Sequence, residues 1–175
     1  MTRGSYESYN PYVNSGNQES GVKPLNLSDV RDRISEVFTD AVVRHRPVPI
    51  TRGGKDLGVL LGIDEIARLV EGISFEPEVF KEAGAVNVWL PEFQIYGRGK
   101  DLAAARLDLI DEVRDYVREY LEEIDSYRAA PNRRAHFPHI IKALAADLSG
   151  HLDGVIFADR PITQAEEGLA AANVR

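Results

Sequence analysis

Apolar residues recur every three or four positions between residues 28 and 46, and most residues between them are polar or charged. This spacing predicts one amphipathic helix of about four turns. Ser28 is the expected N-cap. Asp29 and Asp32 follow in the first turn, where the positive end of the helix dipole stabilises negative charge. A short extended run at residues 23–27 precedes the helix, and Pro47 follows it. The predicted apolar stripe consists of Val30, Ile34, Val37, Phe38, Ala41 and Val42.

A hairpin and a second helix come next. Residues 48–51 and 57–61 have the composition of strands, and Gly53-Gly54 between them permits the positive φ angles of a tight turn. A short helix is predicted from Asp64 to a stop at Gly72. The resulting order is β-α-β-β-α. A unit with so few apolar residues cannot close a core alone, so we expect a symmetric dimer. The apolar face of the short helix consists of Ile66, Leu69 and Val70.

A different pattern begins after Gly72. Residues 73–79 and 86–90 alternate between apolar and polar side chains, and residues 94–97 can extend the pattern, which predicts a small meander. Asp101 is the expected cap of a long helix with one apolar face against this sheet and one strongly acidic face. The apolar face consists of Leu102, Ala105, Leu109, Val113, Tyr116, Val117, Tyr120 and Ile124.

The C-terminal third begins with a basic, turn-rich linker predicted at residues 126–138. Pro138 suits the first turn of a further helix that extends to Leu148, with Gly150 as its stop. Residues 155–157 can form a short strand or an extended anchor. This part therefore predicts one more helix to cover the sheet.

The length of 175 residues allows one ordinary domain or two very small ones. The patterns divide the chain into a module at residues 23–72 and an α/β domain at residues 73–160, so the predicted fold class is α+β. Residues 1–22 are rich in Ser, Asn, Gly and Tyr and are expected to form a disordered arm. Residues 161–175 are expected to form a flexible tail.

The composition of the chain indicates where the protein is located and excludes several types of active site. The hydrophobic share of 43% and charged share of 28% are typical of globular proteins. No apolar stretch approaches the roughly 18–20 residues of a membrane span, and the N-terminus lacks the apolar core of a signal peptide. The absence of cysteine excludes disulfides, thiol nucleophiles and cysteine-based zinc sites, and it fits a reducing compartment. We therefore expect a cytoplasmic protein.

Charge is distributed unevenly along the chain. The net charge is −7, and residues 73–126 alone carry six basic and thirteen acidic side chains. Residues 23–55, in contrast, carry seven basic and four acidic side chains. This separation of a basic front from an acidic middle indicates two partners of different charge.

Three stretches of the first module resemble a known family. Residues 25–31, 47–55 and 58–65 are similar to the N-terminal DNA-binding module of Phd/YefM-type antitoxins, which has a Ser-led helix, an ITR-x-G-K hairpin and a helix that begins with an acidic pair. The resemblance implies an antitoxin of a type II toxin–antitoxin system. Such a protein binds its own operator as a dimeric repressor and neutralises a cognate protein toxin, an RNase or another inhibitor of translation, by direct binding.

Within this module, five residues are candidates for DNA contacts. Ser28 and the free N–H groups of the helix start can bind a phosphate, and the basic residues reach a groove if the helix start lies beside the hairpin turn. Arginine can read guanine with two hydrogen bonds, whereas Lys55 in a glycine turn suits a phosphate. Without the resemblance, these residues would be ordinary surface charges. The candidates are Ser28, Arg31, Arg33, Arg52 and Lys55.

The second half resembles another antitoxin family. The FEP and WLPEFQIYGRGKD-L stretches followed by the long helix look like the β-β-β-α partial RNase H-like fold of HicB-type antitoxins, over about residues 73–125. The acidic face of the helix is first interpreted as a solvated surface. It could also dock a toxin, because RNA-cleaving toxins carry positive surface and complementary charge orients association. The candidate toxin contacts are Asp108, Asp111, Glu112, Asp115 and Glu119.

No catalytic residue, cofactor or metal site is predicted. An active RNase H fold holds Mg²⁺ with acids that converge from strands and helix, whereas these acids follow one outer helix face. His136, His139 and His151 lack a cysteine or well-spaced acid to complete a metal site. Two alternatives to the antitoxin remain: a stand-alone dimeric transcriptional repressor with a C-terminal sensing or oligomerisation domain, and, with little support, a metal-dependent nuclease.

Overall fold

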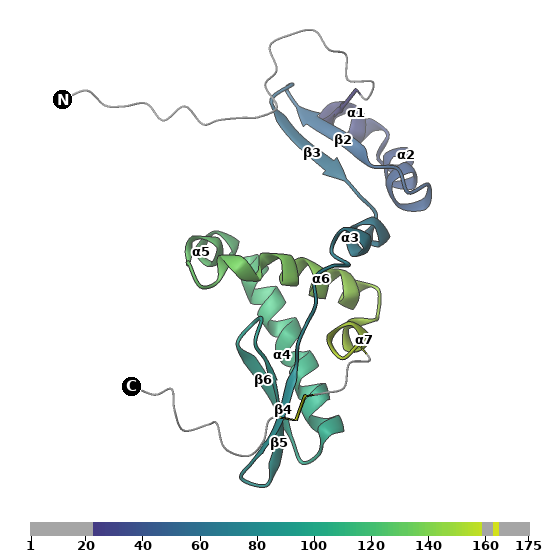
Figure 1. Ribbon diagram of the computed structural model, residues 1–175. Coiled ribbons are helices and arrows are strands. Elements are labelled where there is room, and N and C mark those ends of the chain that lie inside the picture. Colours follow the sequence, from purple (N-terminus) through teal and green to yellow (C-terminus); the bar gives the residue numbers. More distant parts are fainter. Residues whose placement is uncertain (1–22, 159–162, 165–175) are drawn as a thin grey trace, which may run out of the picture.

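The computed structural model describes residues 23–158 and 163–164, and it contains two sheets with helices packed beside each (Figure 1). The strand orders are β1-β2-β3 in the smaller sheet and β6-β5-β4-β7 in the larger one. The fold is therefore mixed α+β. The expected N-terminal arm and most of the expected C-terminal tail lie outside the described residues. The strands are β1 (Leu25–Asn26), β2 (Val48–Arg52), β3 (Asp56–Leu60), β4 (Glu78–Glu82), β5 (Ala85–Leu90), β6 (Ile95–Gly99) and β7 (Thr163–Gln164).

The smaller sheet contains the predicted hairpin. Strand β1 pairs in parallel with β2, and β2 pairs antiparallel with β3. Gly53 and Gly54 adopt φ angles of 59° and 72° in the turn, where a side chain would be strained. Helices α1 (Leu27–Asp32) and α2 (Ile34–Phe38) and a π-helical turn (Thr39–Val43) connect β1 to β2. The core of this part consists of Val30, Val37, Ala41 and Val48.

The prediction of one continuous four-turn helix in this connection was wrong. The N–H of Arg33 bonds to the carbonyls of Asp29 and Val30, and the backbone then leaves the helical region at φ −128°. Further on, the Thr39 hydroxyl donates to the carbonyl of Ser35, a local bond that competes with regular helix geometry where the π-helical turn begins.

The N-cap was also predicted at the wrong residue. Asn26 ends β1 with an extended backbone, and its Oδ1 accepts a hydrogen bond from the N–H of Ser28 at 3.4 Å. Ser28 is therefore the second residue of α1 and not its cap. Because β1 ends in the extended conformation that an N-cap requires, the strand itself determines where the helix begins.

The predicted short helix is present as α3 (Ile63–Leu69), and it lies against α6 (Phe137–Leu148) of the larger part (Figure 1). Lys142 of α6 donates from Nζ to the carbonyls of Glu71 and Ile73, just beyond α3. Leu69, expected on its apolar face, is exposed. The hydrogen bonds from Lys142 thus hold the segment between α3 and β4 against α6.

The larger sheet contains the predicted meander, in which the central strand β5 pairs antiparallel with both β4 and β6. Its first strand begins at Glu78 and not at residue 73, since Pro77 has no N–H for the ladder. Strand β7 pairs in parallel with β4, in the segment expected to be a tail.

The long helix α4 (Leu102–Glu122) crosses one face of this sheet (Figure 1). Asp101 caps it as predicted: its Oδ1 accepts from the N–H of Ala104 at 2.9 Å. Gly97 allows close contact between sheet and helix, since a Cβ there would lie 2.3 Å from the backbone nitrogen of Leu109. The helix therefore packs directly on the backbone of β6.

Three further helices complete this part: α5 (Ile124–Ala129), α6 and α7 (Leu152–Ile156). The linker expected at residues 126–138 contains part of α5 and a 3₁₀ turn (Arg134–His136), because Tyr127 packs against the core and His136 is buried there. Residues 155–157 were expected to be extended, but Val155 and Ile156 lie in α7, where Ile156 is buried. Pro138 in the first turn of α6 and Gly150 beyond its end are confirmed.

The larger core joins α4 to the sheet and to α6. Of the helices in the described part of the chain, none is long and apolar enough to cross a membrane. The buried residues of this core are Phe75, Val88, Leu90, Phe93, Ala105, Leu109, Ile110, Val113, Tyr116, Val117, Tyr120, Ile140, Ala143, Ala146, Leu152 and Ile156.

Candidate functional sites

The start of α1 lies beside the hairpin turn of the smaller sheet. Because Asn26 is paired with Thr51, the first turn of α1 is next to the end of β2, where Arg52 is located. Lys55 follows in the turn, and both side chains are exposed. Arg31 and Arg33 lie at the other end of the six-residue helix α1. The structure thus places the start of α1 beside Arg52, with Arg31 one helical turn beyond Ser28.

Three of the four candidate basic residues form ion pairs. Arg52 pairs with Asp56 at 2.7 Å, Arg31 with Asp32 at 3.6 Å and Arg33 with Glu36 at 3.8 Å. All of these pairs are exposed, and such pairs contribute little to stability, so an anionic ligand can replace the carboxylate. Ser28 differs from the expectation, because its N–H already donates to Asn26 and is not free for a phosphate.

The loop before β2 carries a basic group that was not among the candidates. Arg46 is exposed and has no ion-pair partner within the described residues, while Arg44 pairs with Asp40 at 2.6 Å. His45 contacts Glu65 at the start of α3 and, with Arg68, lowers the pKa of that carboxyl. In the sequence, this basic group is visible as the run of residues 44–46 directly before Pro47. The run lies at the opposite end of β2 from Arg52.

The five acidic candidates all lie on the exposed side of α4. Asp108 accepts a hydrogen bond from the N–H of Arg98 at 2.8 Å, at the edge of β6. Glu119 accepts from the hydroxyl of Tyr127, which raises the pKa of that hydroxyl to about 12. Asp111 and Asp115 pair with arginines of the same helix. Four of the five acids therefore already have partners within the chain, and Glu112 has none among the described residues.

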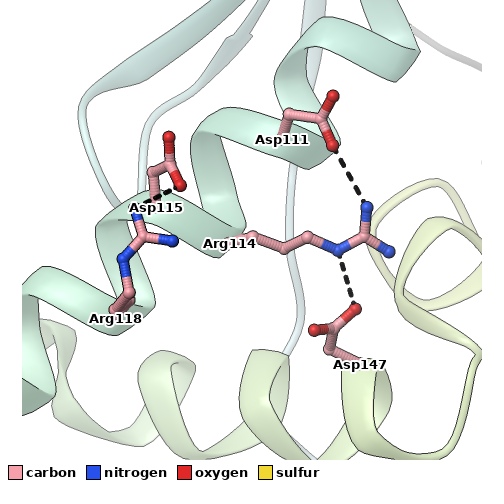
Figure 2. A network of polar contacts seen from close by, with 5 residues as sticks. All are labelled: Asp111, Arg114, Asp115, Arg118 and Asp147. Carbon is pink, nitrogen blue, oxygen red and sulfur yellow. Dashed lines mark hydrogen bonds and ion pairs between the residues drawn. The ribbon is translucent and has the colours of Figure 1, made fainter.

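An ion-pair network joins α4 to α6, as Figure 2 shows. Arg114 donates from Nε to Asp147 of α6 at 2.9 Å and from Nη1 to Asp111 at 3.1 Å. These carboxylates raise the pKa of Arg114. One turn further along α4, Arg118 pairs with Asp115 at 2.6 Å. The network borders a small apolar pocket between the two helices, lined by Val113, Val117, Leu121, Ala143, Leu144 and Leu152.

A second polar network is buried beneath the 3₁₀ turn. The hydroxyl of Tyr116 lies 2.7 Å from Nδ1 of His136 and accepts a hydrogen bond from Arg133 at 2.9 Å. The Tyr116 hydroxyl thus links the guanidinium of Arg133 to the imidazole of His136. Burial lowers the pKa of His136 and raises that of Tyr116. This network fixes the turn against α4.

These arrangements do not form a metal centre. Among residues 23–158 and 163–164, no group of three or more histidines and carboxylates is placed to hold a metal ion. The acids of α4 point along one outer face and engage arginines and backbone.

Comparison with known proteins identifies the family. A crystal structure of a protein from Syntrophomonas wolfei subsp. wolfei, described as the antitoxin part of a proposed toxin/antitoxin system, superposes with a TM-score of 0.62 at 23% identity. The match covers 77% of this chain and 96% of that one, so the two share a fold. No curated protein matches the sequence. Residues 22–157 match the PHD_like family model, described as the antitoxin of RelE/RelB toxin–antitoxin systems, and the chain belongs to that family.

Proposed function

We propose that this antitoxin neutralises its cognate toxin by direct binding and represses its own operon by binding operator DNA as a dimer. The proposal rests on a difference between the two parts of the chain. The part around the smaller sheet has exposed basic side chains and uncovered apolar surface. The larger part has an extensive core and an acidic exterior. Membership of the antitoxin family implies a cognate toxin partner.

The apolar exterior of the smaller sheet supports dimerisation. Its core contains four buried residues, while Leu57 is 61% exposed and Val59 is 58% exposed on β3. Together with Leu27 and Ile50 they border a shallow, mostly apolar depression. Apolar surface of this kind favours association with a matching surface, and a second copy supplies one. The exposed apolar residues of this part are Leu27, Ile34, Phe38, Val43, Leu57 and Val59.

In such a dimer, two copies of the Phd/YefM-like module present their basic residues to the two halves of a near-palindromic operator. Arg52 and Lys55 lie together at the hairpin turn, and Arg31 and Arg33 add charge near the end of α1. Their carboxylate partners are exposed and exchange readily for phosphates.

The larger, HicB-like part is the region we assign to toxin binding. It holds the acidic surplus of the chain, which suits a basic RNase or another inhibitor of translation. Neutralisation in this scheme is occlusion of the toxin, which requires no catalytic residue in the antitoxin. Both partners, operator and toxin, place the function in the cytoplasm.

A mobility-shift experiment with DNA from upstream of the gene tests repression. We expect Arg52→Ala to weaken binding by about 1–3 kcal/mol if Arg52 reads a base, and Lys55→Ala to reduce the salt dependence by about one counterion. Arg68→Ala is the control, since Arg68 is an exposed, ion-paired arginine of α3 outside the candidate set. An unchanged shift for the Arg52 variant removes that residue from the interface, and no shift by the wild type contradicts repression.

Co-expression tests neutralisation. The proteins encoded beside this gene are expressed alone and together with the antitoxin. We expect one of them to arrest growth alone, to lose toxicity with the antitoxin and to form a complex of fixed stoichiometry. Recovery of the homo-oligomer alone, combined with DNA binding, would indicate a stand-alone repressor.

A further inference from the structure

Helices pack on only one face of the larger sheet within the described residues. Val79, Val86, Val88 and Ile95 belong to the core around α4, and Gly97 contacts the helix backbone. Because side chains alternate along a strand, the residues between these positions lie on the opposite face. We call this the outer sheet face. It consists of Glu78, Phe80 and Glu82 of β4, Ala85 and Trp89 of β5, and Tyr96 and Arg98 of β6.

Strand register aligns these residues in rows. Trp89 is paired with Glu78 on one side and Tyr96 on the other, and Asn87 is paired with Phe80 and Arg98. Tyr96 is 57% exposed, while Trp89 is partly exposed. None of the three aromatic residues of this face belongs to the core beneath the sheet. Large aromatic side chains that are presented in this way are the residue type that contributes most to protein interfaces.

Asn87 lies beneath this surface and not on it. Only 2% of its surface is exposed, and within the described residues its Nδ2 group has no hydrogen-bond acceptor. A buried donor without an acceptor is costly, so such groups are rare in folded proteins. The amide is covered by atoms of this chain, so a partner on the outer sheet face does not contact it.

The outer sheet face carries a small negative surplus. Glu78 and Glu82 of β4 and Arg98 of β6 are exposed, and none of the three has an ion-pair partner in the described part of the chain. On α4, Asp111 and Asp115 are neutralised by arginines of the helix, and Glu112 is unpaired among the described residues. The free negative charge on β4 therefore favours a cationic partner. It also disfavours single-stranded nucleic acid, which requires a positively charged groove beside the stacking aromatics.

The edge of the sheet determines how a partner can approach. The N–H of Arg98 on β6 is occupied by the carboxylate of Asp108 from α4. This contact occupies one of the backbone groups that another strand would pair with at β6. It therefore disfavours strand addition at this edge relative to docking on the face of the sheet.

We propose that the outer sheet face is the docking surface for the cognate toxin, an inference that rests on the proposed neutralising function. The toxin presents an apolar depression to Trp89 and Tyr96, and lysine or arginine side chains to Glu78 and Glu82. This assignment replaces the acidic side of α4 as the principal contact.

Fluorescence provides a direct test, because Trp89 is the only tryptophan of the chain. The probe is the neighbouring gene product that the co-expression experiment identifies as toxic, titrated into the full-length antitoxin, with any tryptophan of the toxin replaced by phenylalanine. We expect the emission of Trp89 to shift to shorter wavelength and its quenching by acrylamide to fall in proportion to complex formation.

Variants complete the test. Tyr96→Ala is expected to weaken toxin binding by at least about tenfold, because Tyr96 is an exposed anchor. The matched controls lie on α4: Leu107→Ala, which is 69% exposed, and the double variant Asp111→Asn/Asp115→Asn. Both controls should bind as the wild type does. Circular dichroism verifies that each variant is folded.

Each contrary outcome has a defined meaning. Formation of the complex without any change in Trp89, with full binding by Tyr96→Ala, overturns the docking surface and leaves neutralisation intact. Weakened binding by the α4 variants instead assigns the toxin to α4. If Tyr96→Ala changes the sedimentation mass of the antitoxin alone, a second copy covers this face and the inference is wrong. If no neighbouring product binds the wild type, the proposed neutralisation itself fails.

Discussion

The two sheets of this antitoxin differ in how completely they are covered. Sixteen buried apolar residues form the core of the larger part, and four form that of the smaller one. Six large apolar side chains are exposed around the smaller sheet, whereas Tyr96, Leu107 and Leu148 are exposed around the larger one. The larger part therefore buries enough apolar residues for a core of its own, while the smaller part leaves uncovered the apolar side chains on which the proposed dimer rests.

The strongest test of this contrast is to disturb the packing of the larger part. In Gly97→Ala, the new Cβ would lie 2.3 Å from the nitrogen of Leu109 and 2.4 Å from the carbonyl oxygen of Ala105. Both are backbone atoms of α4, so helix and sheet must move apart. We expect a loss of about 3 kcal/mol in the free energy of unfolding, measured by urea denaturation followed by Trp89 fluorescence.

Gly58→Ala is the matched control in the smaller sheet. No atom lies within 4 Å of a Cβ at Gly58, although it is also in the middle of a strand. We expect little change in stability for this variant. Equal losses in the two variants would show that the close contact between β6 and α4 is not what stabilises the larger part.

The second test concerns concentration. If the smaller part is completed by a second copy, each tenfold dilution should lower its apparent stability by about 1.4 kcal/mol, while the transition of the larger part stays fixed. Far-UV circular dichroism follows both parts, and Trp89 follows the larger one alone. Val59→Ser should remove the concentration dependence, and Leu107→Ser on α4 should preserve it. A dilution series without any effect would contradict dimerisation through this sheet.

The same contrast explains which elements the sequence could predict. The hairpin, the long helix, its Asp101 cap and the Gly150 stop were predicted correctly, because each depends on local periodicity or on residues adjacent in the chain. The break at Arg33 was missed, because the apolar spacing of residues 28–46 is equally compatible with one helix. Residues 155–157 of the larger part were missed for the same reason, since their apolar run does not distinguish a strand from the short helix α7.

The candidate surfaces were predicted less completely, for a different reason. The basic residues at the hairpin turn were selected from the family resemblance together with their charge, and the acids of α4 from helical spacing and charge. The ion pair between Arg114 and Asp147 could not, because it depends on α6 crossing α4. The outer sheet face was also missed: alternation separates the two faces of a strand, but only the position of α4 determines which face stays uncovered.

The third test uses pH. Burial lowers the pKa of His136 below 6.5, so the unfolded chain binds a proton in a range where the folded chain does not. Stability of the larger part should therefore fall as the pH decreases through 6.5 and level off below the folded pKa. Glu92, whose pKa is raised by burial, acts in the opposite direction above pH 4.5.

The variant His136→Gln separates these contributions. It should remove the loss of stability below pH 6.5 and leave the effect of Glu92, as measured by urea midpoints at a series of pH values. An unchanged pH profile in this variant would exclude His136 as the titrating group. The smaller part should show no corresponding change in its own transition.

The smallest test compares the helix caps of the two parts. Asp101 accepts a hydrogen bond of 2.9 Å and begins a helix of 21 residues that supports the larger core, whereas Asn26 accepts one of 3.4 Å and begins a helix of six residues. We expect Asp101→Ala to cost about 1 kcal/mol and Asn26→Ala about 0.5 kcal/mol in unfolding experiments. A charged cap with a short bond at a long helix stabilises more than a neutral cap with a long bond. If Asn26→Ala proved the more costly, the smaller part would depend on its local helix start more than on its partner, and the contrast between self-sufficient and partner-completed folding would have to be reversed.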